Sequence, residues 1–179
     1  IKQQYAEKLI DELNDLFAND NMRFHAGLSY RNILVLKGNH FSADLKTDKP
    51  DDSHGESLTN HFPKPLSSKA EHTAEVLTDL MTRAACKLES SETNKELTSL
   101  GKPPANGIWP WSGGQCKAFN KLKDKYGISG AVISAVDVIN GLGRFLGMDV
   151  IKVPGATGYI DTNYEGKAAA AVKAIKNHD

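Results

Sequence analysis

The chain has 179 residues, of which 40% are apolar and 25% charged, as is typical of a globular protein with a packed core. Lysine plus arginine equals aspartate plus glutamate at 22 each, so the formal net charge is zero. This balance argues against a nucleic-acid-binding surface or a polybasic membrane patch. No apolar run approaches the roughly 20 residues that a membrane-spanning helix needs. We therefore expect neither nucleic acid nor a membrane as a partner.

The chain contains two cysteines, Cys86 and Cys116, and no CxxC pair, which is too few for a disulfide framework. Cys86 falls on the apolar face of a helical pattern, and we expect it to be a small buried hydrophobic residue. This cysteine usage indicates a reducing, cytoplasmic compartment. Because the chain starts without a methionine and inside a helical pattern, and carries no signal peptide, we expect it to be part of a longer protein.

The first elements are a helix and two strands. Residues 2–18 are predicted to form an amphipathic helix. Its apolar stripe consists of Tyr5, Leu9, Leu13, Leu16 and Phe17. Two strands are predicted over 22–30 and 31–38, with a turn near Gly27, which is free to adopt a positive φ. The continuous apolar run 33–36 predicts that the second strand is buried on both faces.

Residues 39–66 are polar and show no period, which predicts a long loop that is functional or mobile. The loop carries His40, His54 and His61. No pair of them has the spacing of metal ligands. Histidines in a polar loop are more often simply solvated, although a metal site stays an alternative. Among the three we consider His54, in the segment PDDSHGE, the best candidate.

Two helices are predicted next. Ser68 and Glu71 have the spacing of a capping box, in which each side chain bonds the other residue's backbone N–H. Apolar residues at helical spacing then predict a helix over 68–89. A shorter helix over 92–100 is predicted to end at Gly101, followed by two prolines.

The second half alternates short strands and helices. Strands are predicted at 107–111, 130–136 and 149–153, and helices at 117–126, 137–147, with Asp137 as its cap, and 164–177. A strand–helix–strand–helix order with short connections predicts parallel strands.

The two halves predict different fold classes. Residues 1–105 have an α+β pattern of long helices and a short hairpin, whereas residues 106–179 have the βαβα pattern of an α/β segment. We therefore place a domain boundary near residue 105.

Two arginines and a glycine motif are candidate functional features. In GLGRFLG (141–147) the third glycine comes one residue late for a dinucleotide fingerprint. Close helix packing at Gly141 and Gly143 is the favoured interpretation. Arg31 and Arg144 lie beside small or polar residues, where a planar guanidinium suits a carboxylate or phosphate. A structural salt bridge is an equally good explanation of each arginine.

The segment VPGATGYIDTNYEGKA (153–168) combines glycines with the start of a predicted helix, as a phosphate cradle would. Asp161, however, would repel phosphate, and no cation precedes Lys167. Asp161, Thr162 or Asn163 is therefore expected to cap the final helix, with Asn163 kept as a candidate substrate contact.

Three strings together resemble a known family: SYRNILVLKG (29–38), GKPPANGIWPWSGG (101–114) and KYGISGAVISAVDVINGLGRFLGMDVIKVPGATGYIDTNYEGKA (125–168). They resemble the archaeal-type cofactor-independent phosphoglycerate mutases of the alkaline phosphatase superfamily. The resemblance covers most of residues 2–178 and is densest over 103–168.

This resemblance implies a two-domain enzyme that interconverts 2- and 3-phosphoglycerate through a phosphoserine. It also implies two divalent metals (Mn, Mg or Zn) and an inserted domain that closes over the substrate. Residues 1–105 would be most of that inserted domain, and 106–179 a segment of the phosphatase-like core. The family's serine nucleophile and metal ligands match no position of this chain. We therefore expect no catalytic or metal-binding residue here, an isolated chain without activity, and the rest of the parent chain as a partner.

The resemblance also suggests substrate-binding residues. Arg31 matches the arginine of the family's S-Y-R segment and is the first candidate for an anion contact. Asn106 and Trp109 match a segment where the inserted domain rejoins the core, and Asp137 and Arg144 match the block after it. His54 lies where this chain departs from the family's P-P-H-D pattern. Another phosphotransferase or phosphonate-processing enzyme of the superfamily, or a non-catalytic interaction domain, stays an alternative.

Overall fold

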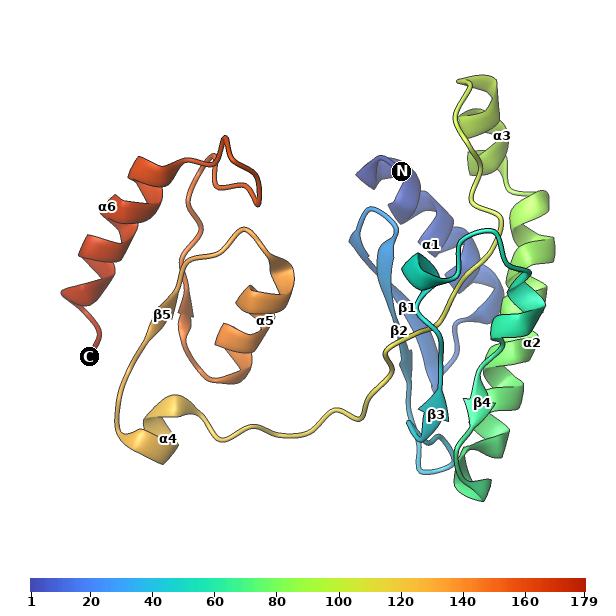
Figure 1. Ribbon diagram of the computed structural model, residues 1–179, viewed down its shortest axis with the longest axis horizontal. Coiled ribbons are helices and arrows are strands. Elements are labelled where there is room, and N and C mark those ends of the chain that lie inside the picture. Colours follow the sequence, from blue (N-terminus) through green and yellow to red (C-terminus); the bar gives the residue numbers. More distant parts are fainter. The chain divides into compact units, whose positions relative to one another are not determined.

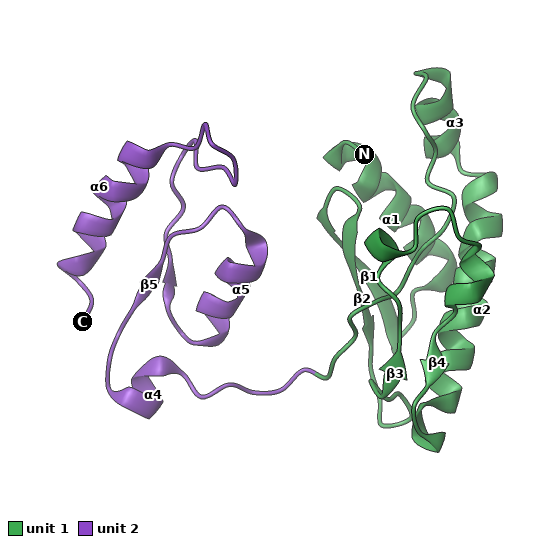
Figure 2. Ribbon diagram, in the orientation of Figure 1, with its two compact units in different colours: residues 1–115 green, residues 116–179 purple.

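The computed structural model describes all residues from 1 to 179 and divides into two compact units, Ile1–Gln115 and Cys116–Asp179 (Figures 1 and 2). The division falls beyond the expected boundary near residue 105, because the intervening segment is bound to the first unit. No helix of either unit has both the length and the apolar composition required to cross a membrane.

Unit 1 is an α+β unit, as expected. Its helices and strands are α1 (Gln3–Phe17), β1 (Met22–Leu28), β2 (Arg31–Leu36), β3 (Leu45–Lys46), β4 (Lys64–Pro65), α2 (Glu71–Glu89) and α3 (Glu92–Ser99). Three short 3-10 turns are η1 (Pro50–Asp52), η2 (Leu58–His61) and η3 (Ser68–Ala70). The expected long loop therefore contains a small antiparallel ladder, β3 with β4.

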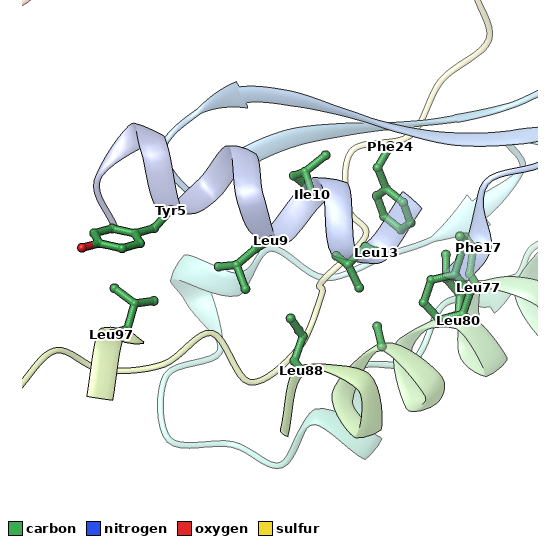
Figure 3. Close-up of a cluster of buried hydrophobic side chains, with 11 residues drawn as sticks. Tyr5, Leu9, Ile10, Leu13, Phe17, Phe24, Leu77, Leu80, Leu88 and Leu97 are labelled. Carbon is green, nitrogen blue, oxygen red and sulfur yellow. The ribbon is translucent and has the colours of Figure 1, made fainter. Parts of the chain in front are cut away.

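The core of unit 1 forms where the apolar stripe of α1 meets α2 (Figure 3). Leu13 of α1 and Leu80 of α2 are each only 2% exposed. The helical spacing predicted this stripe correctly except at Leu16. That residue was expected in the stripe but is 46% exposed. A buried leucine contributes about 1.5–3 kcal/mol by leaving water, so the burial of Leu13 and Leu80 stabilises unit 1.

The β1–β2 hairpin covers the core with one face only. Its antiparallel register pairs Met22 with Leu36 and Phe24 with Leu34, and the Phe24 ring lies edge-on to Phe17 with centroids 6.5 Å apart. Ile33 points away and is 61% exposed. The prediction of a strand buried on both faces was therefore wrong. A two-stranded sheet with one covered face leaves alternate residues in solvent.

A β-bulge shifts the hairpin register between His25 and Leu28. A Cβ atom at Gly27 would overlap the carbonyl oxygen of Arg31, so glycine is required there for space. The turn instead places Ser29 at a positive φ of 58°. The expected positive φ at Gly27 was wrong, because strand proximity rather than turn geometry selects this glycine.

Helix α2 begins one turn later than the capping box predicted. Ser68 lies in η3, and α2 begins at Glu71 with no side-chain cap. Helix α3 is capped by Ser91, whose hydroxyl accepts a hydrogen bond of 3.1 Å from the Asn94 N–H, and Gly101 ends it with φ +67°, as expected. Cys86 is exposed, so the prediction that it is buried was wrong.

Helix α3 contacts α1 through polar groups that are distant in sequence. The Thr93 hydroxyl donates to Glu12 at 2.6 Å, and Lys8 Nζ lies 3.1 Å from Glu96 Oε2. The Tyr5 hydroxyl donates to the same carboxylate at 3.2 Å. These contacts connect the N-terminal helix of unit 1, α1, with α3.

Residues 105–112, here named the strap, run along unit 1 without regular structure; the strand predicted at 107–111 is absent. Asn94, only 5% exposed, fixes the start of the strap. Its Nδ2 donates to the carbonyl oxygens of Leu88 and Ala105 at 2.8 and 2.6 Å, and its Oδ1 accepts from Ala105 N–H at 2.8 Å. One buried side chain thus pairs three backbone groups.

Unit 2 has the expected βαβα order, preceded by the short helix α4. Its elements are α4 (Leu122–Tyr126), β5 (Ala131–Val132), α5 (Asp137–Phe145), β6 (Asp149–Val150) and α6 (Tyr164–Ile175). Strands β5 and β6 are parallel, which confirms that prediction. The strands and α4 are shorter than expected, and Asp137 is the first residue of α5 rather than its cap.

Glycine allows α5 to approach the two strands of unit 2. Gly143 is buried, and a Cβ atom there would overlap the side chain of Val132 and touch Val150. A Cβ atom at Gly141 would meet no other part of the fold within 4 Å. Close packing therefore explains Gly143 but not Gly141.

We predict that Leu13→Ala lowers the free energy of unfolding of unit 1 by about 2–5 kcal/mol, because it leaves a cavity between α1 and α2. Urea denaturation followed by circular dichroism measures the loss. Leu16→Ala on the same helix is the control and should change stability by less than about 0.5 kcal/mol. Equal losses for both variants would contradict this assignment of the core.

We predict that Asn94→Ala destabilises unit 1 by about 2–3 kcal/mol, because it leaves buried backbone groups without partners. The same denaturation experiment measures the change. Asn60→Ala serves as the control, since the exposed Asn60 side chain makes no hydrogen bond. A neutral effect of Asn94→Ala would show that water replaces the clamp.

Candidate functional site

Trp109 attaches the middle of the strap to the 39–66 segment. Its indole N–H donates to the backbone carbonyl of Asp48 at 2.9 Å. The indole also packs against the His61 ring, with centroids 5.1 Å apart and planes 30° from parallel. Further along the strap, the Ser112 N–H donates to the Thr47 hydroxyl at 3.3 Å.

His61 lies between two carboxylates. Its Nδ1 is 2.9 Å from Asp48 Oδ2 and its Nε2 is 2.9 Å from Glu56 Oε2, and its side chain is 9% exposed. A neutral imidazole has a single N–H, so only the imidazolium can donate to both carboxylates. The hydrogen bond to Asp48 raises the pKa of His61, assisted by Glu56 and opposed by partial burial.

The same contacts act on Asp48 in the opposite direction. The hydrogen bond from His61 lowers the pKa of Asp48, and the positive charges of His61, Lys46 and Lys64 add to the effect. Lys46 and Lys64 face each other across the β3–β4 ladder. The side chain of Asp48 therefore lies among cations, while its backbone carbonyl binds Trp109.

The histidine favoured from sequence is not the one that the fold engages. His54 is exposed and makes neither a hydrogen bond nor an ion pair. His40 packs against the rings of Phe41 and His72, with centroids 4.2 and 5.7 Å away. His61 was missed as the important histidine because its partners are distant along the loop and follow no spacing rule.

No three histidine, cysteine, aspartate or glutamate side chains lie close enough together to hold a metal ion. The two divalent metals that the resemblance implies therefore do not fit the residues of this chain.

Arg31 is exposed at the start of β2, at the turn end of the hairpin. Its guanidinium lies 5.2 Å from the centre of the Tyr30 ring and donates to the Tyr30 hydroxyl at 3.2 Å. No carboxylate lies within 4 Å of it. The guanidinium is stacked and uncompensated by an acid, as an anion-binding arginine would be.

The other predicted site residues are not gathered into one cluster. Asn106 is exposed on the strap and its side chain makes no hydrogen bond. In unit 2, Asp137 and Arg144 lie in the first and last turns of α5, which places their Cα atoms about 10 Å apart along the helix. Both side chains belong to exposed residues.

Asn163 has a structural role. Its Oδ1 accepts from Gly166 N–H at 2.8 Å, which caps α6, and its Nδ2 donates to the Pro154 carbonyl at 2.9 Å. The capping prediction for this loop is therefore confirmed for Asn163, and Gly155 turns the chain with φ +73°. Both polar atoms of the Asn163 side chain are occupied by the backbone.

Comparisons with a family model, with related sequences and with solved structures agree with one another. The family model described as 2,3-bisphosphoglycerate-independent phosphoglycerate mutase matches residues 1–94. A protein of that name from Methanosarcina acetivorans is 41% identical over 179 residues, which is 100% of this chain and 43% of the relative. A probable one from Geobacter sulfurreducens is 38% identical over 172 residues, which is 96% of this chain and 41% of the relative.

A solved structure agrees. The cofactor-independent phosphoglycerate mutase from Thermoplasma acidophilum matches 99% of this chain and 46% of its own length, with a TM-score of 0.64 and 29% identity. The chain thus spans less than half of the length of the relatives that it matches. Since the family model matches more than half of the residues, the chain belongs to the family of 2,3-bisphosphoglycerate-independent phosphoglycerate mutases.

Proposed function

We propose that this chain is part of a phosphoglycerate mutase that interconverts 2- and 3-phosphoglycerate through a phosphoserine. The observation that carries the proposal is its 41% identity, over its full length, to a mutase of this family. A small phosphorylated acid is the substrate, and glycolysis in the cytoplasm is the setting.

In this proposal the two units have different tasks. Unit 1, with its hairpin and helices, is most of the inserted domain that closes over the substrate. Unit 2 is a segment of the phosphatase-like core, which its parallel β5 and β6 support. The serine nucleophile and the two divalent metals (Mn, Mg or Zn) belong to parts of the enzyme that these residues do not match. Closure excludes water, which would otherwise hydrolyse the phosphoenzyme.

The residues of this chain act on binding rather than on the bond-breaking step. Arg31 offers an exposed, uncompensated guanidinium to the phosphate or carboxylate of the substrate. Asn106, with its unoccupied amide, is a second candidate contact on the strap, and Trp109 holds that segment in place. In unit 2, Arg144 is a candidate anion contact, whereas the exposed carboxylate of Asp137 would bind only the hydroxyl groups of glycerate.

The proposed function is tested by assaying the complete protein and the 179-residue chain with 3-phosphoglycerate and Mn²⁺. We expect 2-phosphoglycerate to form only with the complete protein, because phosphoryl transfer needs the nucleophile and metals. Turnover by the isolated chain would contradict the division of tasks. An inactive complete protein would contradict the mutase assignment, and activity on phosphonates instead would favour another enzyme of the superfamily.

Arg31 is tested in the complete protein. We predict that Arg31→Ala lowers kcat/KM for 3-phosphoglycerate by about tenfold to a hundredfold, equivalent to about 1.4–2.8 kcal/mol, because an anion contact is lost. Arg23→Ala on the same hairpin is the matched control, since Arg23 is also exposed and forms no ion pair. An unchanged kcat/KM for Arg31→Ala would leave this arginine without a role in binding.

A further inference from the structure

We propose that His61 is a proton-dependent latch: its imidazolium, bound between Asp48 and Glu56 and stacked on Trp109, holds the Trp109 end of the strap on unit 1, and loss of its proton releases that end. The residues involved come from three separate segments. Asp48 follows β3, Glu56 precedes η2, and Trp109 lies on the strap. The inference concerns unit 1 alone and does not depend on the mutase assignment.

The geometry requires the proton. Both ring nitrogens of His61 lie 2.9 Å from a carboxylate oxygen. After deprotonation one nitrogen presents a lone pair to a carboxylate at that distance, so two acceptors face each other without a hydrogen. One of the two carboxylates must then move away. Asp48 is the carboxylate that is coupled to the strap, because its own backbone carbonyl accepts the hydrogen bond from the Trp109 indole, and in the proposed opening a shift of the Asp48 backbone breaks that bond.

The end of the strap, residues 109–112, depends on this contact because its other attachments are few. Ala105 is clamped by Asn94, and Ser112 makes one long hydrogen bond of 3.3 Å to Thr47. Thr47 directly precedes Asp48, so movement of Asp48 disturbs that bond too. The Asn94 clamp and the packing of Ala105 and Ile108 against the core are independent of His61, so the start of the strap stays attached.

The charged groups around the latch set its pH range. Asp48 and Glu56 favour the imidazolium, whereas Lys46 and Lys64 act through Asp48 by keeping it ionised. The pKa of His61 is raised, so its contribution is complete below the ordinary histidine pKa and is lost as pH rises through the raised value. The pKa of Asp48 is lowered, so its contribution is lost only as pH falls through that lowered value. The latch is therefore closed below the ordinary histidine pKa and opens as pH rises through the raised pKa of His61.

Trp109 itself reports the state of the latch. The chain contains two tryptophans, so Trp111→Phe leaves Trp109 as the only one. The emission of this 179-residue variant is recorded from acidic to alkaline pH together with far-UV circular dichroism. We expect one shift to longer wavelength, with a midpoint above the ordinary value of about 6.5, while the helix signal stays constant. A midpoint at or below that value, or simultaneous loss of helix, overturns the proposal.

Variants of the latch separate it from other titrations. His61→Gln should abolish the emission step, and Asp48→Asn should move its midpoint down, because the main partner of the imidazolium is lost. His54→Gln is the matched control and should leave the step unchanged, since His54 is exposed in the same segment. A step that persists in His61→Gln overturns the proposal.

A measurement on the unsubstituted chain keeps the test independent of folding defects. In the ¹⁵N spectrum of the imidazole side chains, we expect the His61 signal to keep both nitrogens protonated at pH values above the ordinary histidine pKa of about 6.5; the His61→Gln spectrum serves only to assign that signal. Loss of the proton at or below that pH would overturn the proposal.

Discussion

The burial of the α1 stripe against α2 is the interaction on which the rest of unit 1 depends. Leu13 and Leu80 lie at its centre, and the hairpin covers it with a single face. Helix α3 and the strap then attach at the edges of this core, largely through side-chain hydrogen bonds to backbone groups. The arrangement lets a segment without regular structure keep a fixed path, because Asn94 and Asp48 supply the partners that a sheet would otherwise provide.

Sequence patterns predicted the elements that depend mainly on neighbouring residues. Helical spacing located α1, α2 and α3, and glycine in the left-handed region marked the end of α3. The predictions were wrong where tertiary contacts determine the burial of a strand or the start of a helix. A continuous apolar run cannot reveal whether a sheet has one covered face or two, and Ser68 entered a 3-10 turn instead of a capping box. The bulge at Gly27 follows from the approach of the opposite strand, which no single-sequence pattern contains.

The candidate site was predictable only in part. The resemblance selected Trp109 and Arg31, and the structure shows an anchored indole and an uncompensated guanidinium at these positions. It could not select His61, because the partners of this histidine are brought near it by turns within a polar, aperiodic segment. At Asn163 the structure shows a structural role, because both polar side-chain atoms bond the backbone. A family signature can therefore reflect the folding of a loop rather than contact with a substrate.

The contacts between α1 and α3 have a consequence for the order of folding. Tyr5 and Glu96 are 91 residues apart in sequence, and Glu12 and Thr93 are 81 apart. On the ribosome, the apolar stripe of α1 is therefore made long before the helices that cover it. Such non-local closure slows folding and leaves apolar surface exposed in the nascent chain. Among the elements that follow α1, the β1–β2 hairpin is made first and is able to shield part of that stripe during synthesis.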